Sequence, residues 1–156
     1  MITLFSRLIK GTLILLMVMM VFSVGYGVFT RYVLDNAASW TGELSSYILV
    51  WVTFLGSSWA VIEKKHINVD ILTKTIPFSL QLIIKVGVHV SLLIFSCLLV
   101  YFGTIVSIDN LDNKALTLPI TMGLVYCVIP ISGLIMFSGF AKQAIQLFTE
   151  RADSVH

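Results

Sequence analysis

Four long stretches without a charged side chain constrain the fold of this chain more than any other feature. They cover residues 11–30, 44–62, 86–108 and 115–141. A bilayer core about 30 Å thick requires about 20 helical residues, so each stretch is long enough to cross it. The stretches are continuously apolar and lack the alternation of barrel strands, which leaves helices as the spanning structure. We therefore predict an all-α membrane protein with four transmembrane helices.

Composition supports a single integral membrane domain over residues 1–156. The chain is 58% hydrophobic and 12% charged, with a mean hydropathy of +0.98. Soluble domains contain about 25% charged residues, so a water-soluble core of this length is excluded. The net charge is only +2 and no basic stripe with interleaved aromatic residues occurs. We therefore predict the lipid bilayer as the surroundings and no nucleic-acid partner.

The placement of lysine and arginine predicts the orientation. With four spans, both ends of the chain and the 63–85 segment lie on one side. That side carries eight of the ten basic residues: Arg7, Lys10, Lys64, Lys65, Lys74, Lys85, Lys142 and Arg151. Only Arg31 and Lys114 fall on the other side. By the positive-inside rule, we expect both termini to be cytoplasmic. The first apolar stretch exceeds the about 7–15 residues of a signal peptide, so we expect a retained span.

Two further segments suit the membrane surface. Residues 2–10 and 71–85 mix apolar residues with lysine or arginine, as short amphipathic helices at the inner headgroup layer do. In the fourth stretch, Pro119 lies near the expected helix start, where proline costs little. Pro130 falls in the middle of this stretch and predicts a kink.

Candidate chemical groups are few. The spans contain one histidine, His89, and no carboxylate, which argues against a self-sufficient pump because intramembrane charges mark ion pathways. His66 and Asp70 are four residues apart, but two ligands do not make a metal site. No nucleophile elbow, phosphate-binding loop or zinc motif occurs, so we predict no enzyme, no cofactor and no metal. A haem-bearing membrane anchor that uses His66 and His89 stays open as an alternative.

A stripe of mainly aromatic side chains runs along one face of the second span. At 100° per residue, one helical face carries Trp40, Glu43, Tyr47, Trp51, Phe54 and Ser58. An interfacial aromatic belt explains Trp40, whereas Trp51 lies near mid-span, where belts do not reach. The stripe therefore predicts a helix–helix packing face. Glu43 in the first helical turn is favoured by the helix dipole, or it pairs with Arg31 across two helices. Both roles stay open.

Three motifs in order resemble the small membrane subunit of tripartite ATP-independent periplasmic (TRAP) transporters, the DctQ-type family. They are RYVLDNAASWTGELSSYILVWVTFLGSSWAV, KKHINVDIL with His66 and Asp70, and ALTLPITMGLVYCVIPISGLIMF. Family members often carry an acid at position 42 and an arginine at position 46, whereas this chain has Gly42 and Ser46. These positions have the spacing of a helical ion pair, so Glu43 is left as the sole acid at this helix start.

The resemblance implies a role as a scaffold subunit that does not itself bind substrate. Its partners would be a large elevator subunit, in a stable complex, and a periplasmic substrate-binding protein that docks transiently. Transport would be sodium-driven uptake of a carboxylate such as a C4-dicarboxylate, a 2-oxo acid or sialic acid. The stripe from Trp40 to Phe54, with Arg31, would pack on the large subunit or within the chain's own bundle. The rival from another class is an autonomous small four-helix, proton-coupled exporter, which needs a membrane-embedded carboxylate.

Overall fold

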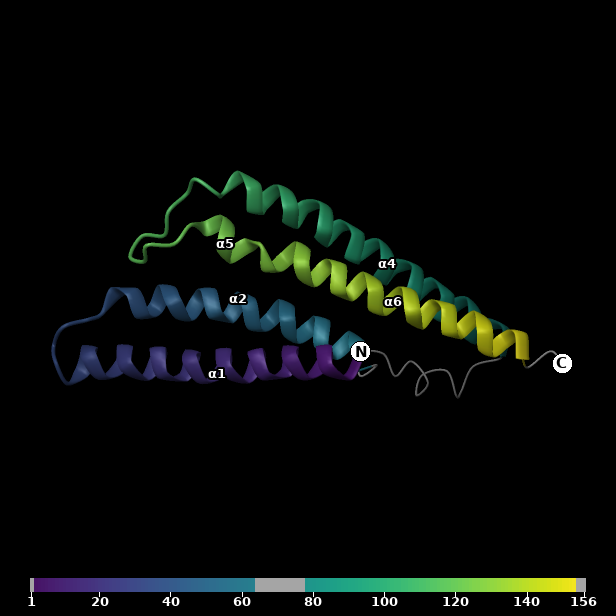
Figure 1. The fold of residues 1–156 in the computed structure, drawn as a ribbon, viewed down its shortest axis with the longest axis horizontal. Helices are drawn as coiled ribbons and strands as arrows, with labels where there is room; N and C mark the ends of the chain where they lie inside the picture. Colours follow the sequence, from purple (N-terminus) through teal and green to yellow (C-terminus); the bar gives the residue numbers. More distant parts are fainter. Residues whose placement is uncertain (1, 64–77, 154–156) are drawn as a thin grey trace.

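The computed structural model describes residues 2–63 and 78–153, and the regular structure in these ranges is helical. The helices are α1 (Ile2–Tyr32), α2 (Ser39–Ile62), α4 (Phe78–Asp109), α5 (Met122–Tyr126) and α6 (Val128–Asp153) (Figure 1). Four segments are long and apolar enough to cross a membrane: Ser6–Tyr32, Ser39–Ile62, Val86–Asp109 and Met122–Ile145. The predicted all-α class with four transmembrane helices is confirmed.

The ends of two spanning helices are longer than predicted. Residues 2–10 continue into α1 without a break, and residues 78–85 are the first turns of α4. Both segments are therefore extensions of spanning helices and do not form separate short helices. Residues 71–77 lie outside the described part of the chain. The position of these segments at the headgroup layer stays a prediction.

The fourth span begins later than predicted. Residues 115–121 form a tight hairpin in which the Ala115 N–H donates to the Ile120 carbonyl over 2.9 Å, and the helix starts at Met122. Pro119 explains the difference, because it has no N–H to donate and disfavours helical backbone at the residue before it. An apolar composition alone cannot distinguish such a hairpin from a helix.

A single-residue interruption divides the fourth span. α5 ends at Tyr126, Cys127 adopts a turn, and α6 begins at Val128. Pro130 has no N–H to donate to the Tyr126 carbonyl, so the helical hydrogen-bond ladder is incomplete at this point. The interruption therefore lies in the turn that precedes Pro130.

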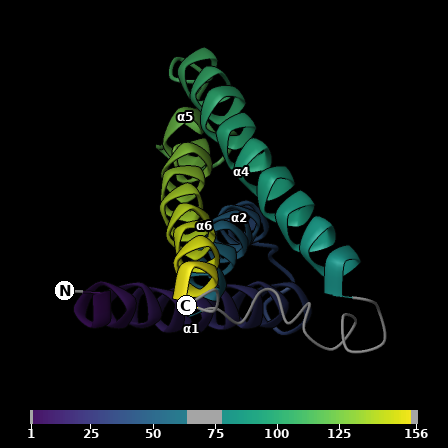
Figure 2. The same ribbon diagram turned by 90° about the vertical axis from the view of Figure 1, so that its right-hand side faces the viewer.

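The helices form two antiparallel hairpins, α1 with α2 and α4 with α6 (Figure 1). α2 also packs on α6, so the order of the long helices across the structure is α1, α2, α6, α4. Figure 2 shows that α4 diverges from α6 towards its Phe78 end. The result is an open array in which α2 and α6 are central and α1 and α4 form the edges.

The contact between α2 and α6 contains the apolar core. Val61 of α2 is buried against Met136 and Phe140 of α6. Gly139 permits the close approach, since a Cβ at that position would lie 2.6 Å from Val61 Cγ1. Three leucines of α4 pack on this cluster: Leu92, Leu93 and Leu99. Small residues at helix contacts are typical of membrane proteins, in which tight packing replaces the hydrophobic effect between helices.

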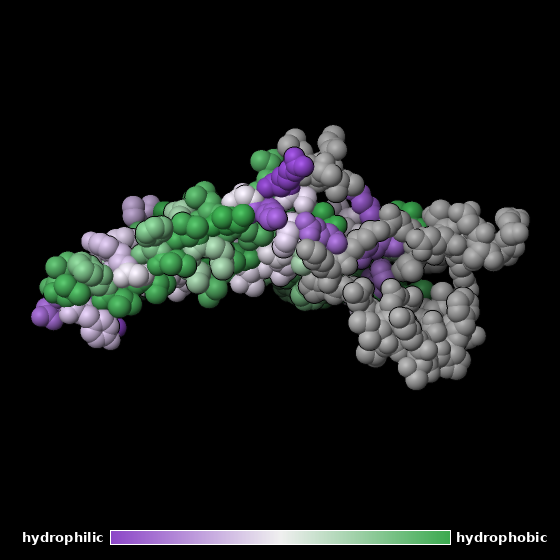
Figure 3. All heavy atoms as spheres, turned by 90° about the horizontal axis from the view of Figure 1, so that it is seen from below, coloured by the Kyte–Doolittle hydropathy of each residue, from purple (hydrophilic) through white to green (hydrophobic). Residues whose placement is uncertain are grey.

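Most of the apolar surface faces outwards. In the spanning part of α1 only 6% of the apolar window is buried, against 39% in the fourth span, so the side of α1 that does not contact α2 faces its surroundings. Figure 3 shows apolar side chains over the middle of one face and hydrophilic residues towards its ends. Lipid or another membrane protein must cover this surface, because the exposure of so much apolar surface to water is unfavourable.

Gly123 provides a test of the contact between α4 and α5. A Cβ at Gly123 would lie 2.7 Å from the Ser107 carbonyl oxygen and 2.9 Å from Leu111 Cα, both of them backbone atoms that cannot rotate away. We expect Gly123→Ala to destabilise the protein by about 1–3 kcal/mol through overpacking. Thermal unfolding in detergent micelles, followed by circular dichroism, measures the effect.

Gly25→Ala is the matched control, because a Cβ at Gly25 of α1 meets nothing within 4 Å. There the substitution should be neutral or stabilise by up to about 1 kcal/mol, the helix propensity gain of alanine over glycine. Equal melting temperatures for the two variants would contradict the described packing of α5 on α4.

Candidate functional site at the two-loop end

Glu43 is the centre of the most extensive polar contact between the two hairpins in the described part of the chain. It lies near the start of α2, at the two-loop end, which carries the 33–38 and 110–121 connections. One carboxylate oxygen, Oε1, accepts a hydrogen bond from the Leu116 N–H over 2.8 Å. The other, Oε2, accepts from the Thr117 N–H over 2.7 Å and from the Thr117 hydroxyl. One side chain of α2 therefore binds the hairpin that precedes α5.

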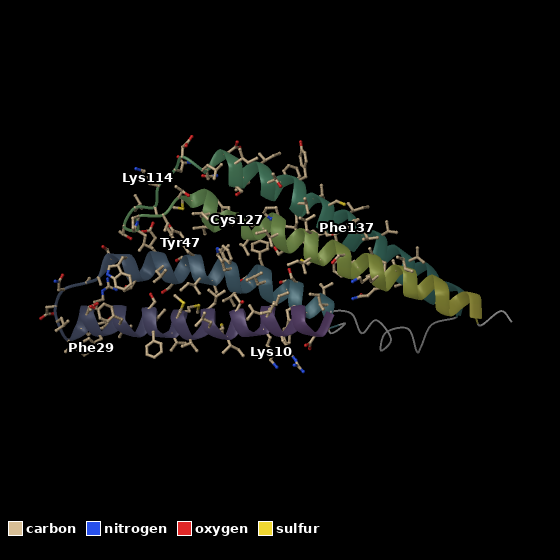
Figure 4. The ribbon with its side chains drawn as sticks, viewed as in Figure 1. Lys10, Phe29, Tyr47, Lys114, Cys127 and Phe137 are labelled. Atoms are coloured by element: carbon tan, nitrogen blue, oxygen red, sulfur yellow. The ribbon has the colours of Figure 1, made fainter. Side chains whose placement is uncertain are left out.

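Tyr47 completes the ring of donors around this carboxylate. It lies one helical turn after Glu43, and its hydroxyl donates to Glu43 Oε1. Figure 4 shows Tyr47 on the side of α2 that faces the second hairpin. All of the groups that contact the carboxylate are donors, which matches an ionised carboxylate because that group can only accept.

We call residues 113–121 the strap. Its tip presents two successive backbone N–H groups, those of Leu116 and Thr117, to one carboxylate, an arrangement that commonly binds anions in proteins. The strap is in turn joined to the second hairpin, since the Met122 N–H donates to the Asn113 carbonyl over 2.8 Å.

Further bonds fix the base of the strap to α4 and α5. The Gly123 N–H donates to the Asn110 carbonyl over 2.8 Å, and the Ser107 hydroxyl donates to the Gly123 carbonyl over 2.9 Å. The strap, α5 and the end of α4 therefore form one hydrogen-bonded unit, which Glu43 connects to α2.

An ion pair with Arg31 is one of the two roles that the sequence leaves open for Glu43. Arg31 lies exposed in the last turn of α1, and no ion pair joins it to Glu43 in the residues that the structure describes. The strap N–H groups and the Thr117 hydroxyl already occupy both carboxylate oxygens. A solvent-exposed ion pair would contribute only about 0–1 kcal/mol, too little to displace them.

The aromatic stripe is divided between several neighbours. The ring of Trp40 packs on Tyr26 of α1, with centroids 5.7 Å apart. Glu43 and Tyr47 face the strap, as described above, and Trp51 and Phe54 are half-buried. At the far end of the stripe, the buried Ser58 hydroxyl donates to the Ser132 carbonyl of α6 over 3.2 Å. Parts of this stripe thus contact the chain's own helices.

Polar packing between α1 and α2 was not anticipated. The Ser23 hydroxyl donates to the Thr41 carbonyl over 3.1 Å, and the Ser45 hydroxyl donates to Ser23 Oγ over 3.2 Å. Gly27 lies so close that a Cβ there would be 2.5 Å from Thr41 Oγ1. The signal was present in the sequence, because small residues recur at Ser23, Gly27 and Thr30 with helical spacing.

Of the other candidate groups, the structure describes His89 and the two cysteines. His66 and Asp70 lie outside the described residues, and His89 is half-buried in α4. Cys97 and Cys127 are free thiols. Within residues 2–63 and 78–153, no group of three or more histidine, cysteine or acidic side chains could hold a metal ion.

The fold and the site together define a small multi-pass membrane protein in which polar contacts supplement the packing between its two hairpins. Residues 15–150 match the family described as tripartite ATP-independent periplasmic transporters, DctQ component. The chain is also 32% identical over 107 residues to a curated Haemophilus influenzae protein whose assignment as a TRAP transporter small permease protein is provisional. That match covers 68% of this chain and 66% of the relative, slightly less than two thirds of its length. The chain belongs to the DctQ component family of TRAP transporters.

A double-mutant cycle tests the bond between Glu43 and Thr117. Glu43→Gln and Thr117→Val should each lower the melting temperature, and the double variant should lose less than the sum because both changes remove the same contact. Thermal unfolding in one detergent provides the four values. Thr104→Val supplies the control, since the Thr104 hydroxyl donates to Val100 of its own helix and is exposed. Strict additivity of Glu43→Gln with Thr117→Val would show that the two side chains do not interact.

Proposed function

We propose that this chain is the scaffold subunit of a sodium-driven TRAP transporter for carboxylate solutes and does not itself bind substrate. Membership of the DctQ component family supports the role of small permease subunit. The observation that carries the scaffold role is the engagement of Glu43. A transport carboxylate must exchange partners during the cycle, whereas both oxygens of Glu43 bind backbone and side-chain donors of the strap.

The distribution of charge supports the same role. Residues 11–30, 44–62, 86–108 and 122–141, which lie within the spanning helices, contain no charged side chain. Ion-coupled carriers place ionisable groups at mid-membrane depth, where they bind or relay the coupling ion. In this chain the coupling ions and the substrate would be bound by the large subunit, and substrate capture would fall to a soluble substrate-binding protein.

The open array suits a subunit that packs beside a larger one. α1 and α4 lie at its edges, and their large apolar side chains include the exposed Phe22 and Tyr101. A closed bundle would turn such residues inwards, whereas an array leaves continuous helix faces for lipid and for the large subunit. The protein is a multi-pass protein of the inner membrane. In our proposal both termini are cytoplasmic and the two-loop end is periplasmic, where the substrate-binding protein would meet it.

Copurification tests the assembly. A tagged copy of this chain, expressed with the large TRAP subunit and extracted in mild detergent, should retain that subunit through affinity and size-exclusion chromatography. Reconstituted uptake of a carboxylate solute, such as a C4-dicarboxylate or sialic acid, should require the large subunit, the binding protein and a sodium gradient. Transport by this chain alone in proteoliposomes would overturn the proposal.

Replacement of Glu43 separates the scaffold from a small proton-coupled exporter. In the reconstituted three-component system, Glu43→Gln should leave the sodium dependence of uptake unchanged, because the carboxylate serves packing and not coupling. A lower yield of assembled complex is compatible with that result. Asp112→Asn, which removes an exposed acid at the same end, is the matched control. Loss of ion coupling in Glu43→Gln alone would favour the exporter.

A further inference from the structure

The two hairpins are joined at two places of different character. Away from the two-loop end, the contact between α2 and α6 is buried and extensive. It combines the Val61 and Phe140 cluster with the bond from Ser58 to the Ser132 carbonyl. The Gln143 side-chain N–H also donates to the Val61 carbonyl over 2.9 Å. We call this the inner contact.

The second connection is the bond of Glu43 to the strap, and it is exposed. Leu116 is 93% exposed and Thr117 is also exposed, so little apolar burial accompanies the hydrogen bonds there. Figure 1 shows α2 and α5 diverging towards the two-loop end, with the strap between them. The strap thus reaches back to α2 mainly through polar contacts, whereas the inner contact is packed.

The fourth span is weakened at one point between the two connections, because Pro130 has no N–H to donate to the Tyr126 carbonyl. α5 is separated from α6 at Cys127, and the strap and α5 are hydrogen-bonded to α4 through Asn110 and Ser107. Opening of the strap therefore need not disturb the inner contact. Regions with few buried contacts and exposed hydrogen bonds open locally at low free-energy cost.

We propose that Glu43 holds the strap closed and that the strap opens as a local unit, while the inner contact stays intact, when this carboxylate is removed. The device consists of one anion and the donors around it: the N–H groups of Leu116 and Thr117, and the Thr117 and Tyr47 hydroxyls. The chemical class of group that fits these donors is a carboxylate. This inference rests on the geometry of the chain and is independent of the transport role.

Amide hydrogen exchange of the full chain in lipid nanodiscs, read by mass spectrometry with residue-resolving fragmentation, tests the proposal. In Glu43→Gln, exchange at the Leu116 and Thr117 amides should accelerate on the order of tenfold, because they lose a charge-assisted acceptor. Amides of α6 around Phe140 should exchange as in the wild type. Asp112→Asn, an exposed acid near the strap, should change neither region.

A rescue experiment examines the class of the bound group. Glu43→Ala removes the carboxylate and leaves space beside the strap donors, so acetate at high concentration should restore protection of the same two amides. Acetamide, which has a similar shape and no charge, should not. Tyr47→Phe gives a milder variant, in which the carboxylate remains and a smaller acceleration is expected.

Three results would overturn the inference. Unchanged exchange at Leu116 and Thr117 in Glu43→Gln would mean that the carboxylate does not hold the strap. Equal acceleration around Phe140 would mean that Glu43 supports the whole fold and not a local unit. Equal effects of acetate and acetamide would mean that the donors do not select a carboxylate.

Discussion

The packing of α2 on α6 is the contact that converts two separate helical hairpins into one structure. It depends on the absence of a side chain at Gly139, which allows Val61 to approach α6, and on Phe140, which fills the space beside it. The Ser58 hydroxyl lies within hydrogen-bond distance of two carbonyls, that of Phe54 in its own helix at 2.9 Å and that of Ser132 in α6 at 3.2 Å. The site at the two-loop end has its position because this contact sets the relative placement of α2 and the fourth span.

Glu43 shows how a charged residue in a membrane protein can serve architecture. A carboxylate at the end of a spanning helix invites an interpretation as a transport group, since such groups are costly and often functional. Here its lone pairs are used by backbone N–H groups that a tight hairpin would otherwise leave for water. The same bonds satisfy the donors of the hairpin and the charge of the acid, so neither needs another partner.

Hydropathy predicted the all-α class and the four spans, because these depend on properties that each side chain carries. The strap was missed, since residues 115–121 are as apolar as a helix and only Pro119 signals a break. The partner of Glu43 was also missed, but the reason is different. This partner consists largely of backbone N–H groups, which every residue except proline has. The identities of Leu116 and Thr117 therefore do not indicate that they bind a carboxylate. Arg31 was considered as a partner because its charge is visible in the sequence, whereas in the structure it lies exposed in the last turn of α1.

The order of the helices in space also has a consequence for how the chain is built. α6 lies between α2 and α4, although it follows both of them in the chain. α1 and α2 can pair as soon as both have entered the membrane, but the main partner of α4 does not yet exist when α4 arrives. In chain order, the fourth span is thus the segment that comes to lie between α4 and the first hairpin after both have been made. The glycines of α6, among them Gly133 against Val100 and Gly139 against Val61, allow this late helix to settle between two neighbours that are already in place.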